Sequence, residues 1–93
     1  MYRIVITCED AKVDEIVVTH DPVTIGRTSD NDIRIDDTTV SGHHARFVTE
    51  DGIVYIEDLD STNGTYVNGA PVAERALSNG DVIVIGTHKL RYR

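Results

Sequence analysis

Short runs of alternating apolar and polar residues follow one another along the chain, separated by turns rich in glycine, asparagine and aspartate. Alternation with a period of two is typical of a β-strand that buries one face. Residues branched at Cβ favour strands over helices. They are abundant here, with 12 valines, 10 isoleucines and 10 threonines against three leucines. The pattern therefore predicts an all-β fold.

The predicted strands are short and closely spaced. They comprise residues 2–7, 14–19, 23–26, 33–35, 45–49, 53–57, 66–67, 81–85 and 88–92. Three Asn-Gly pairs, and Asp51-Gly52 between two of the runs, supply residues that accept the positive φ of tight turns. Only residues 72–77 have helical potential, and that stretch is too short to be stable as a helix by itself. This spacing predicts a two-sheet antiparallel β-sandwich of about eleven short strands.

Length and cysteine content limit the organisation of the protein. With 93 residues, the chain has the size of one domain, so we expect residues 1–93 to form a single unit. The lone Cys8 cannot form a disulfide within the chain, which fits a reducing compartment. Neither a leader peptide nor a long apolar stretch is visible. We therefore expect a cytoplasmic monomer.

The charge of the chain disfavours two classes of partner. A net charge of −7 works against nucleic acids and anionic membranes, because both bind to basic faces. It also opposes any phosphorylated ligand, which carries almost two negative charges. Salt screens this repulsion, because the Debye length is ~8 Å at physiological salt. The repulsion of a phosphate by distant carboxylates is therefore weak compared with its attraction to an arginine in direct contact.

The acidic stretch from Asp30 to Asp37 raises the question of a calcium site. An EF-hand loop starting at Asp30 would need glycine at its sixth position and glutamate at its twelfth, where this chain has Ile35 and Ser41. The four histidines show no metal-ligand spacing. We therefore expect a solvated acidic loop, with no metal and no cofactor.

Three short motifs carry candidate chemistry: Gly26-Arg27, Ser41-Gly42-His43-His44 and Thr62-Asn63-Gly64-Thr65. A guanidinium group gives phosphate two parallel charge-assisted hydrogen bonds, and an amide side chain both donates and accepts. Each motif alone has an ordinary explanation, as an exposed strand-end charge or a tight turn. Ser41 and His44 also suggest a nucleophile and its base, but no Gly-x-Ser-x-Gly elbow surrounds the serine.

Taken together and in this order, the motifs resemble those of the forkhead-associated (FHA) domain family. The resemblance extends through Val67-Asn68-Gly69 and through residues 80–86. It implies a β-sandwich whose loops at one end bind phosphothreonine in a peptide, without catalysis, as a module of kinase-linked signalling. Other domains that bind phosphorylated motifs likewise use arginines to contact the phosphate. The alternative is a degenerate FHA fold that serves only as a protein-interaction scaffold.

The resemblance also assigns roles to single residues. Arg27 would bind the phosphate, the Ser41 hydroxyl would donate to a phosphate oxygen, and Thr62 and Asn63 would hold the peptide. Glycine at position 26 is expected to let the chain turn sharply as it leaves its strand. The residues expected to support the site are Gly26, His44 and Gly64.

Gly42 departs from the family pattern. The family often has arginine, lysine or asparagine at this position, adding a contact to the phosphate, whereas Gly42 would leave only its backbone N–H group. A lost charged hydrogen bond costs roughly 1.5–3 kcal/mol, or about tenfold to a hundredfold in affinity. His43 would compensate only if its ring turned toward the site. Gly42 is therefore included among the expected phosphopeptide contacts, through its backbone.

Overall fold

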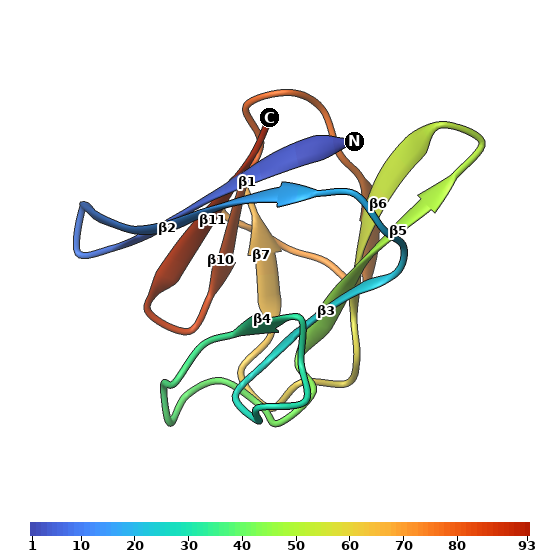
Figure 1. Cartoon of the computed structure of the whole chain (residues 1–93). Helices are drawn as coiled ribbons and strands as arrows, with labels where there is room; N and C mark the ends of the chain where they lie inside the picture. Colours follow the sequence, from blue (N-terminus) through green and yellow to red (C-terminus); the bar gives the residue numbers. More distant parts are fainter.

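The computed structural model describes all residues from 1 to 93 and contains eleven strands and no helix (Figure 1). The strands are β1 (Tyr2–Cys8), β2 (Ala11–Val18), β3 (Val23–Gly26), β4 (Ile33–Arg34), β5 (Ala45–Glu50), β6 (Ile53–Asp58), β7 (Thr65–Val67), β8 (Ala70–Pro71), β9 (Glu74–Ala76), β10 (Val82–Ile85) and β11 (His88–Tyr92). Consequently, no helix is long and apolar enough to span a bilayer.

The strands form two sheets. One has six strands in the order β2-β1-β11-β10-β7-β8, and the other has five in the order β4-β3-β5-β6-β9. The predicted all-β two-sheet fold is confirmed, with one refinement. Strands β3 and β4 pair in parallel, whereas the other strand pairs are antiparallel.

Some local details were not predicted. Residues 72–77, which were expected to be too short for a stable helix by themselves, contain none, and Glu74–Ala76 pair with β6 as an edge strand. Strand β2 begins at Ala11, three residues earlier than expected, because Glu9 and Asp10 alone make the turn, with φ angles of 53° and 63°. In both places, backbone hydrogen bonds to a neighbouring strand (β6 or β1) determine the observed secondary structure.

Alternation along the strands builds the core between the sheets. In β1, Ile4 and Ile6 are buried, whereas Arg3, Val5 and Thr7 lie on the opposite face of the strand. Seventeen buried apolar residues form one continuous cluster. Each fully buried aliphatic or aromatic side chain contributes about 1.5–3 kcal/mol by leaving water, so this cluster is the main source of stability.

The two ends of the sandwich differ in what they contain. The N- and C-termini lie at one end, and the loops after β3, β4 and β6 lie at the other (Figure 1). Near the termini, the Tyr2 ring packs against Phe47 and Tyr92, with ring centroids 5.9 and 5.4 Å apart. Burial, with smaller contributions from Asp21 and Tyr92, raises the pKa of Tyr2 well above its usual value.

Candidate ligand-binding site

A hollow of about 300 Å³ lies at the loop end of the sandwich. All five residues predicted to contact a ligand line it, although they come from three separate loops. The lining residues are Arg27, Thr38, Thr39, Val40, Ser41, Gly42, Thr62 and Asn63. The two threonines at 38 and 39 were not predicted, because nothing in the sequence distinguishes them from other loop residues.

Arg27 follows directly after β3 and is held at its backbone and its Nε atom. Its N–H donates to Ser41 O at 3.0 Å, and its Nε donates to Val40 O at 3.2 Å. The side chain is exposed and forms no ion pair with a carboxylate. The guanidinium group is therefore oriented, and its two terminal nitrogens are free to bind an anion.

The Ser41 hydroxyl lies between two loops. Its oxygen accepts a hydrogen bond from the Thr62 N–H at 3.0 Å, which leaves the hydroxyl proton free to be donated to a ligand. His44 is not the partner of this hydroxyl. The ring nitrogen Nδ1 of His44 accepts from the backbone N–H of Ser41 at 3.1 Å. The pair is thus arranged as backbone support and not as a nucleophile with its base.

His44 is fully buried and connects two loops. Because Nδ1 accepts from Ser41 N–H, the ring proton is on Nε2, which donates to Gly64 O at 2.9 Å. The backbone of His44 also donates to Ile25 O at 2.8 Å and accepts from Leu59 N–H at 2.9 Å. One residue thereby connects the serine loop to β3 and to the loop that carries Asn63.

The loop from Ser61 to Gly64 is held in place by the carboxylate of Asp58. This carboxylate accepts from Ser61 Oγ at 2.5 Å and from Thr65 Oγ1 at 2.7 Å. Burial alone would raise the pKa of Asp58, but the hydrogen bonds from Ser61 and Thr65 outweigh it and hold the pKa below its usual value. Asp58 was not predicted as a site-supporting residue, because an aspartate at the end of a strand is a common feature.

Asn63 is oriented by one hydrogen bond and keeps the rest of its amide free. Its Nδ2 donates to Thr39 O at 2.9 Å. The carbonyl oxygen and the second N–H remain available to a peptide backbone. Gly64 follows with a φ of 89°, so the Asn63-Gly64 pair is both a tight turn and a positioned amide.

Gly26 is needed for a different reason from the one predicted. Its φ does not lie in the left-handed region, so a sharp turn does not explain it. A Cβ built at this position would lie 2.1 Å from Gly42 O and 2.7 Å from the amide nitrogen of Asn31. The loop carrying Gly42 packs directly on the backbone of residue 26, and only glycine leaves room for it.

Asn31 is the buried polar residue that sequence reasoning missed. It lies in the Asp30-Asn31-Asp32 stretch that was interpreted as a solvated acidic loop, yet the residue is only 9% exposed. Its Nδ2 donates to Gly42 O at 2.7 Å and to Thr28 O at 2.9 Å. This asparagine therefore holds the backbone of Gly42 in place, within an otherwise exposed acidic segment.

Gly42 and His43 bring no positive charge into the hollow. The backbone of Gly42 has no positive φ, and a Cβ there would meet only the Thr28 methyl group, at 3.4 Å. A side chain at position 42 would thus need only a small adjustment. The ring of His43 contacts Asp30, with Nε2 to Oδ2 at 2.8 Å, and does not line the hollow. The condition for His43 to replace a missing cation is not met.

A further contact ties the turn between β10 and β11 to the edge of the hollow. Asp37 Oδ2 accepts from Thr87 Oγ1 at 2.6 Å and from its N–H at 3.1 Å, and Oδ1 accepts from Thr39 Oγ1 at 2.7 Å. The hydrogen bonds from Thr87 and then Thr39 hold the pKa of Asp37 well below its usual value. Gly86 is packed against this group, because a Cβ there would approach Thr39 Oγ1 to 2.8 Å.

The fold and the hollow define a class of protein: a β-sandwich with a hollow formed by the loops at one end. The model of the FHA domain family matches residues 23–86. The chain belongs to the FHA domain family, which confirms the resemblance seen in its motifs. No group of three or more His, Cys, Asp or Glu side chains is arranged to hold a metal ion.

Among curated proteins, the chain is similar to the glycogen accumulation regulator GarA of Mycolicibacterium smegmatis, with 49% identity over 65 residues. It is also similar to the oxoglutarate dehydrogenase inhibitor of Corynebacterium diphtheriae, with 46% identity over 67 residues. These alignments cover 70% and 72% of this chain but only 41% and 47% of the relatives. The chain thus matches less than half the length of each.

Two solved structures show the same fold. One, from a study of phosphothreonine-dependent FHA domain interactions, has a TM-score of 0.87 at 33% identity and covers 100% of this chain and 96% of its own. The other is the FhaA FHA domain complexed with the intracellular domain of Rv3910. It has a TM-score of 0.85 at 34% identity and covers 97% of this chain and 99% of its own.

Proposed function

We propose that this chain binds phosphothreonine in an extended segment of a partner protein, as a non-catalytic module of kinase-linked signalling. One observation carries the proposal. Arg27, oriented by Val40 O and without a carboxylate partner, faces the same hollow as the Ser41 hydroxyl and the Asn63 amide. An oriented guanidinium and a hydroxyl donor suit a phosphate, and an amide that donates and accepts suits a peptide backbone.

The relatives support the same function at the level of the family. One structural neighbour comes from a study of phosphothreonine-dependent interactions, and another is EmbR of Mycobacterium tuberculosis in complex with a low-affinity phosphopeptide. The curated relatives are named as a regulator and an inhibitor. The roles of Arg27, Ser41, Gly42, Thr62 and Asn63 as phosphopeptide contacts, supported by Gly26, His44 and Gly64, are part of this proposal.

The experiment that tests it compares a phosphothreonine peptide with its unphosphorylated counterpart. Both are titrated calorimetrically into the protein at the same salt concentration, because charged contacts weaken as salt rises. Members of an oriented phosphothreonine peptide library provide the sequence around the phosphate. We expect binding of the phosphorylated peptide alone. Equal binding of the two forms would favour the alternative, a scaffold that uses the FHA fold without reading phosphate.

A further inference from the structure

The outer face of the six-stranded sheet has a charge opposite to that of the molecule. Its outward positions follow from the strand register, which places Val5 between Glu15 and Arg91 and places Thr7 between Lys12 and Lys89. The next row joins Val17, Arg3 and Arg93. We call the residues of this surface the basic face; its cations are Arg3, Lys12, Lys89, Arg91 and Arg93.

Positive charge is concentrated on this face. Five of the nine lysines and arginines lie there, and Glu15 is the only carboxylate among the outward strand residues. The basic face therefore has a net charge of +4 on a chain of −7, which leaves −11 for the rest of the molecule. Glu15 pairs with Lys12 at 2.8 Å and Arg3 at 3.6 Å. No carboxylate pairs with the three remaining cations.

Those three cations form a line. Lys89 and Arg91 are exposed residues of β11, and Arg93 follows directly, so they occupy alternate positions along one extended segment. Alternate residues of an extended chain are ~7 Å apart and point to the same side. A second extended chain with a carboxylate at every other residue has the same spacing. The line therefore matches an alternating acidic segment in both charge and period.

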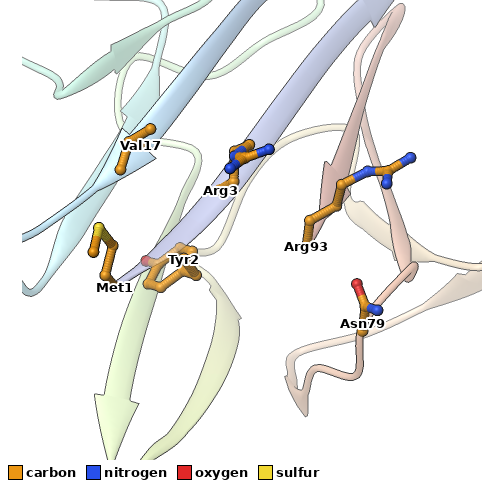
Figure 2. A pocket seen from close by; sticks show the side chains of 6 residues that line it. All are labelled: Met1, Tyr2, Arg3, Val17, Asn79 and Arg93. Atoms are coloured by element: carbon orange, nitrogen blue, oxygen red, sulfur yellow. The ribbon is translucent and has the colours of Figure 1, made fainter.

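Two hollows lie on the same face beside these cations. One, of about 150 Å³, is lined by Val5, Thr7, Val82, Lys89 and Arg91. The other, of about 430 Å³, lies at the terminal end, where Figure 2 shows Arg3 and Arg93 beside Val17 and Asn79. Each offers apolar side chains together with arginine. An acidic segment could therefore place small apolar residues between its carboxylates, against valine.

The basic face is continuous with the candidate ligand-binding site. Tyr66 lies two residues after Gly64, faces outward and pairs in register with Val84, which in turn pairs with Lys89. The β10–β11 turn before Lys89 is bonded to Asp37, beside the hollow. Crossing from β7 to β11 spans two strand spacings, about 10 Å, which about three extended residues cover. About four more residues would reach Arg93.

We propose that the basic face binds an alternating acidic segment of the same partner whose phosphothreonine occupies the loop site. This inference rests on the proposed function and adds the chemistry of the partner. Such a segment would leave the loops over Tyr66 and follow β11 along Lys89, Arg91 and Arg93. The two contacts would act as one bivalent interaction, since the first holds the second at high effective concentration. Charge complementarity between carboxylates and this line selects the partner.

An anionic membrane is the other surface that such a face could meet. Membrane-surface binding normally combines cations with protruding apolar side chains that enter the lipid. On this face Val5, Val82 and Val84 lie half-buried. The exposed apolar side chains Val17 and Tyr66 lie on β2 and β7, with three strands between them, so they form no continuous apolar patch. The remaining −11 charge also lies on the same small molecule, which has a radius of gyration of 11.7 Å. A protein segment is therefore the partner that the geometry favours.

The test uses phosphothreonine peptides with matched tails. One carries an eight-residue tail of alternating glutamate and serine, and the other has glutamine in place of each glutamate. Each tail is placed on the N-terminal or the C-terminal side. Arg91→Glu removes a cation from the line, and Arg75→Glu on β9 is the control, because it changes the net charge equally on an exposed position of the other sheet. Affinity is measured by calorimetry at two salt concentrations.

In one tail placement, we expect the acidic tail to increase wild-type affinity about tenfold at low salt, from several exposed ion pairs, with a smaller gain at high salt. Arg91→Glu should abolish this gain without changing the affinity for the glutamine tail, and Arg75→Glu should retain the gain. No gain in either placement, or equal losses in both variants, would overturn the proposal.

Two further measurements distinguish this proposal from its alternatives, which are phosphate-independent binding and membrane binding. Arg91-dependent binding of the unphosphorylated acidic peptide, without any effect of phosphate, would support the basic face and reject the proposed function of the loops. Vesicles containing phosphatidylserine are tested in the same way by sedimentation. Arg91-dependent vesicle binding, together with no gain from the acidic tail, would assign the face to membranes and overturn the proposal.

Discussion

The two ends of the sandwich are held together by different interactions. At the loop end, the buried side chains of His44 and Asn31 connect separate loops, and the half-buried Asp58 holds the loop that follows it. At the terminal end, the rings of Tyr2, Phe47 and Tyr92 pack on one another. Hydrogen bonds have directions and leave an unpaired partner when one member is removed, whereas ring packing tolerates small shifts.

This difference explains why the proposed ligand contacts lie at one end only. A hollow that must place a guanidinium, a hydroxyl and an amide together needs loops with a fixed position, and the buried polar groups supply that position. The aromatic end stabilises the fold but fixes no comparable set of donors. Substitutions at the loop end should therefore change binding, with or without stability, and those at the terminal end should change stability alone.

The largest effect is expected for Arg27→Ala. Removal of the oriented guanidinium should weaken phosphopeptide binding by about 3 kcal/mol, more than a hundredfold, because two charged hydrogen bonds are lost. The melting temperature should remain almost unchanged, since exposed arginines contribute little to folding. Calorimetric titration and thermal unfolding measure the two quantities. Unchanged affinity in the folded variant would reject the assignment of the phosphate contact, and Arg75→Ala is the matched control.

The second prediction tests the coupling of stability and binding at the loop end. His44→Ala should lower the free energy of unfolding by about 2–4 kcal/mol, because Ser41 N–H and Gly64 O each lose a buried partner. Binding should weaken together with stability. Ser41→Ala should weaken binding with little loss of stability. Denaturant unfolding and peptide titration on both variants would separate support from contact; a His44→Ala protein as stable as wild type would contradict the supporting role.

The third prediction concerns the terminal end. Tyr2→Ala should destabilise the fold by about 2 kcal/mol, because a half-buried ring leaves Phe47 and Tyr92 without their contact. At a temperature where the variant is folded, its phosphopeptide affinity should equal that of wild type. Loss of affinity in parallel with stability would show that the two ends are not independent. Tyr2→Phe, which removes only the buried hydroxyl, serves as the conservative control.

The fourth prediction adds a contact to the loop end. Gly42→Arg should strengthen phosphopeptide binding about tenfold, since it adds a charge beside the phosphate, and a single charged hydrogen bond is worth roughly 1.5 kcal/mol or more. The backbone at position 42 accepts a side chain, because its φ is not positive and only the Thr28 methyl lies near. Titration compares this variant with Gly42→Gln. Equal affinity of wild type and folded Gly42→Arg would show that a missing cation does not limit binding.

The smallest predicted effect is the preference for phosphothreonine over phosphoserine. Burial of the extra methyl group is worth ~0.8 kcal/mol by transfer alone, about fourfold in affinity. A preformed niche among the loops of Ser41 and Thr62-Asn63 would increase the preference, because phosphoserine would leave a void there. Titration of two peptides that differ only in this methyl group, at equal salt, gives the ratio. Equal affinities would mean that the loop end recognises charge alone.

Alternation of apolar and polar residues was sufficient to predict most of the fold. Strands β3 and β11 were predicted with the observed bounds, and most of the others within one residue at each end. Strands β8 and β9 were missed because all their residues are exposed, so no alternation marks them. Their pairing with β7 and β6 is a tertiary contact, and local sequence contains no information on it.

The residues that line the hollow were predicted more completely than the residues that hold its loops in place. The structure brings Arg27, Ser41 and Asn63 together around one hollow, as the motifs indicated. The burial of Asn31 and the close approach of the Gly42 carbonyl to Gly26 were not predicted, because both depend on how closely the Gly42 loop packs against β3. Such distances follow from the assembled sandwich and not from the composition of any one segment.

The position of β11 between β1 and β10 limits how the domain can be cut from a longer polypeptide. The family match ends at residue 86, before this strand, and starts after β1 and β2. A fragment restricted to that match would lack three adjacent strands of one sheet and would leave the edge of β10 unpaired. It would also lose Thr87, the partner of Asp37. The segment matched by the family model is therefore shorter than the smallest fragment that can keep the loops around the hollow in place.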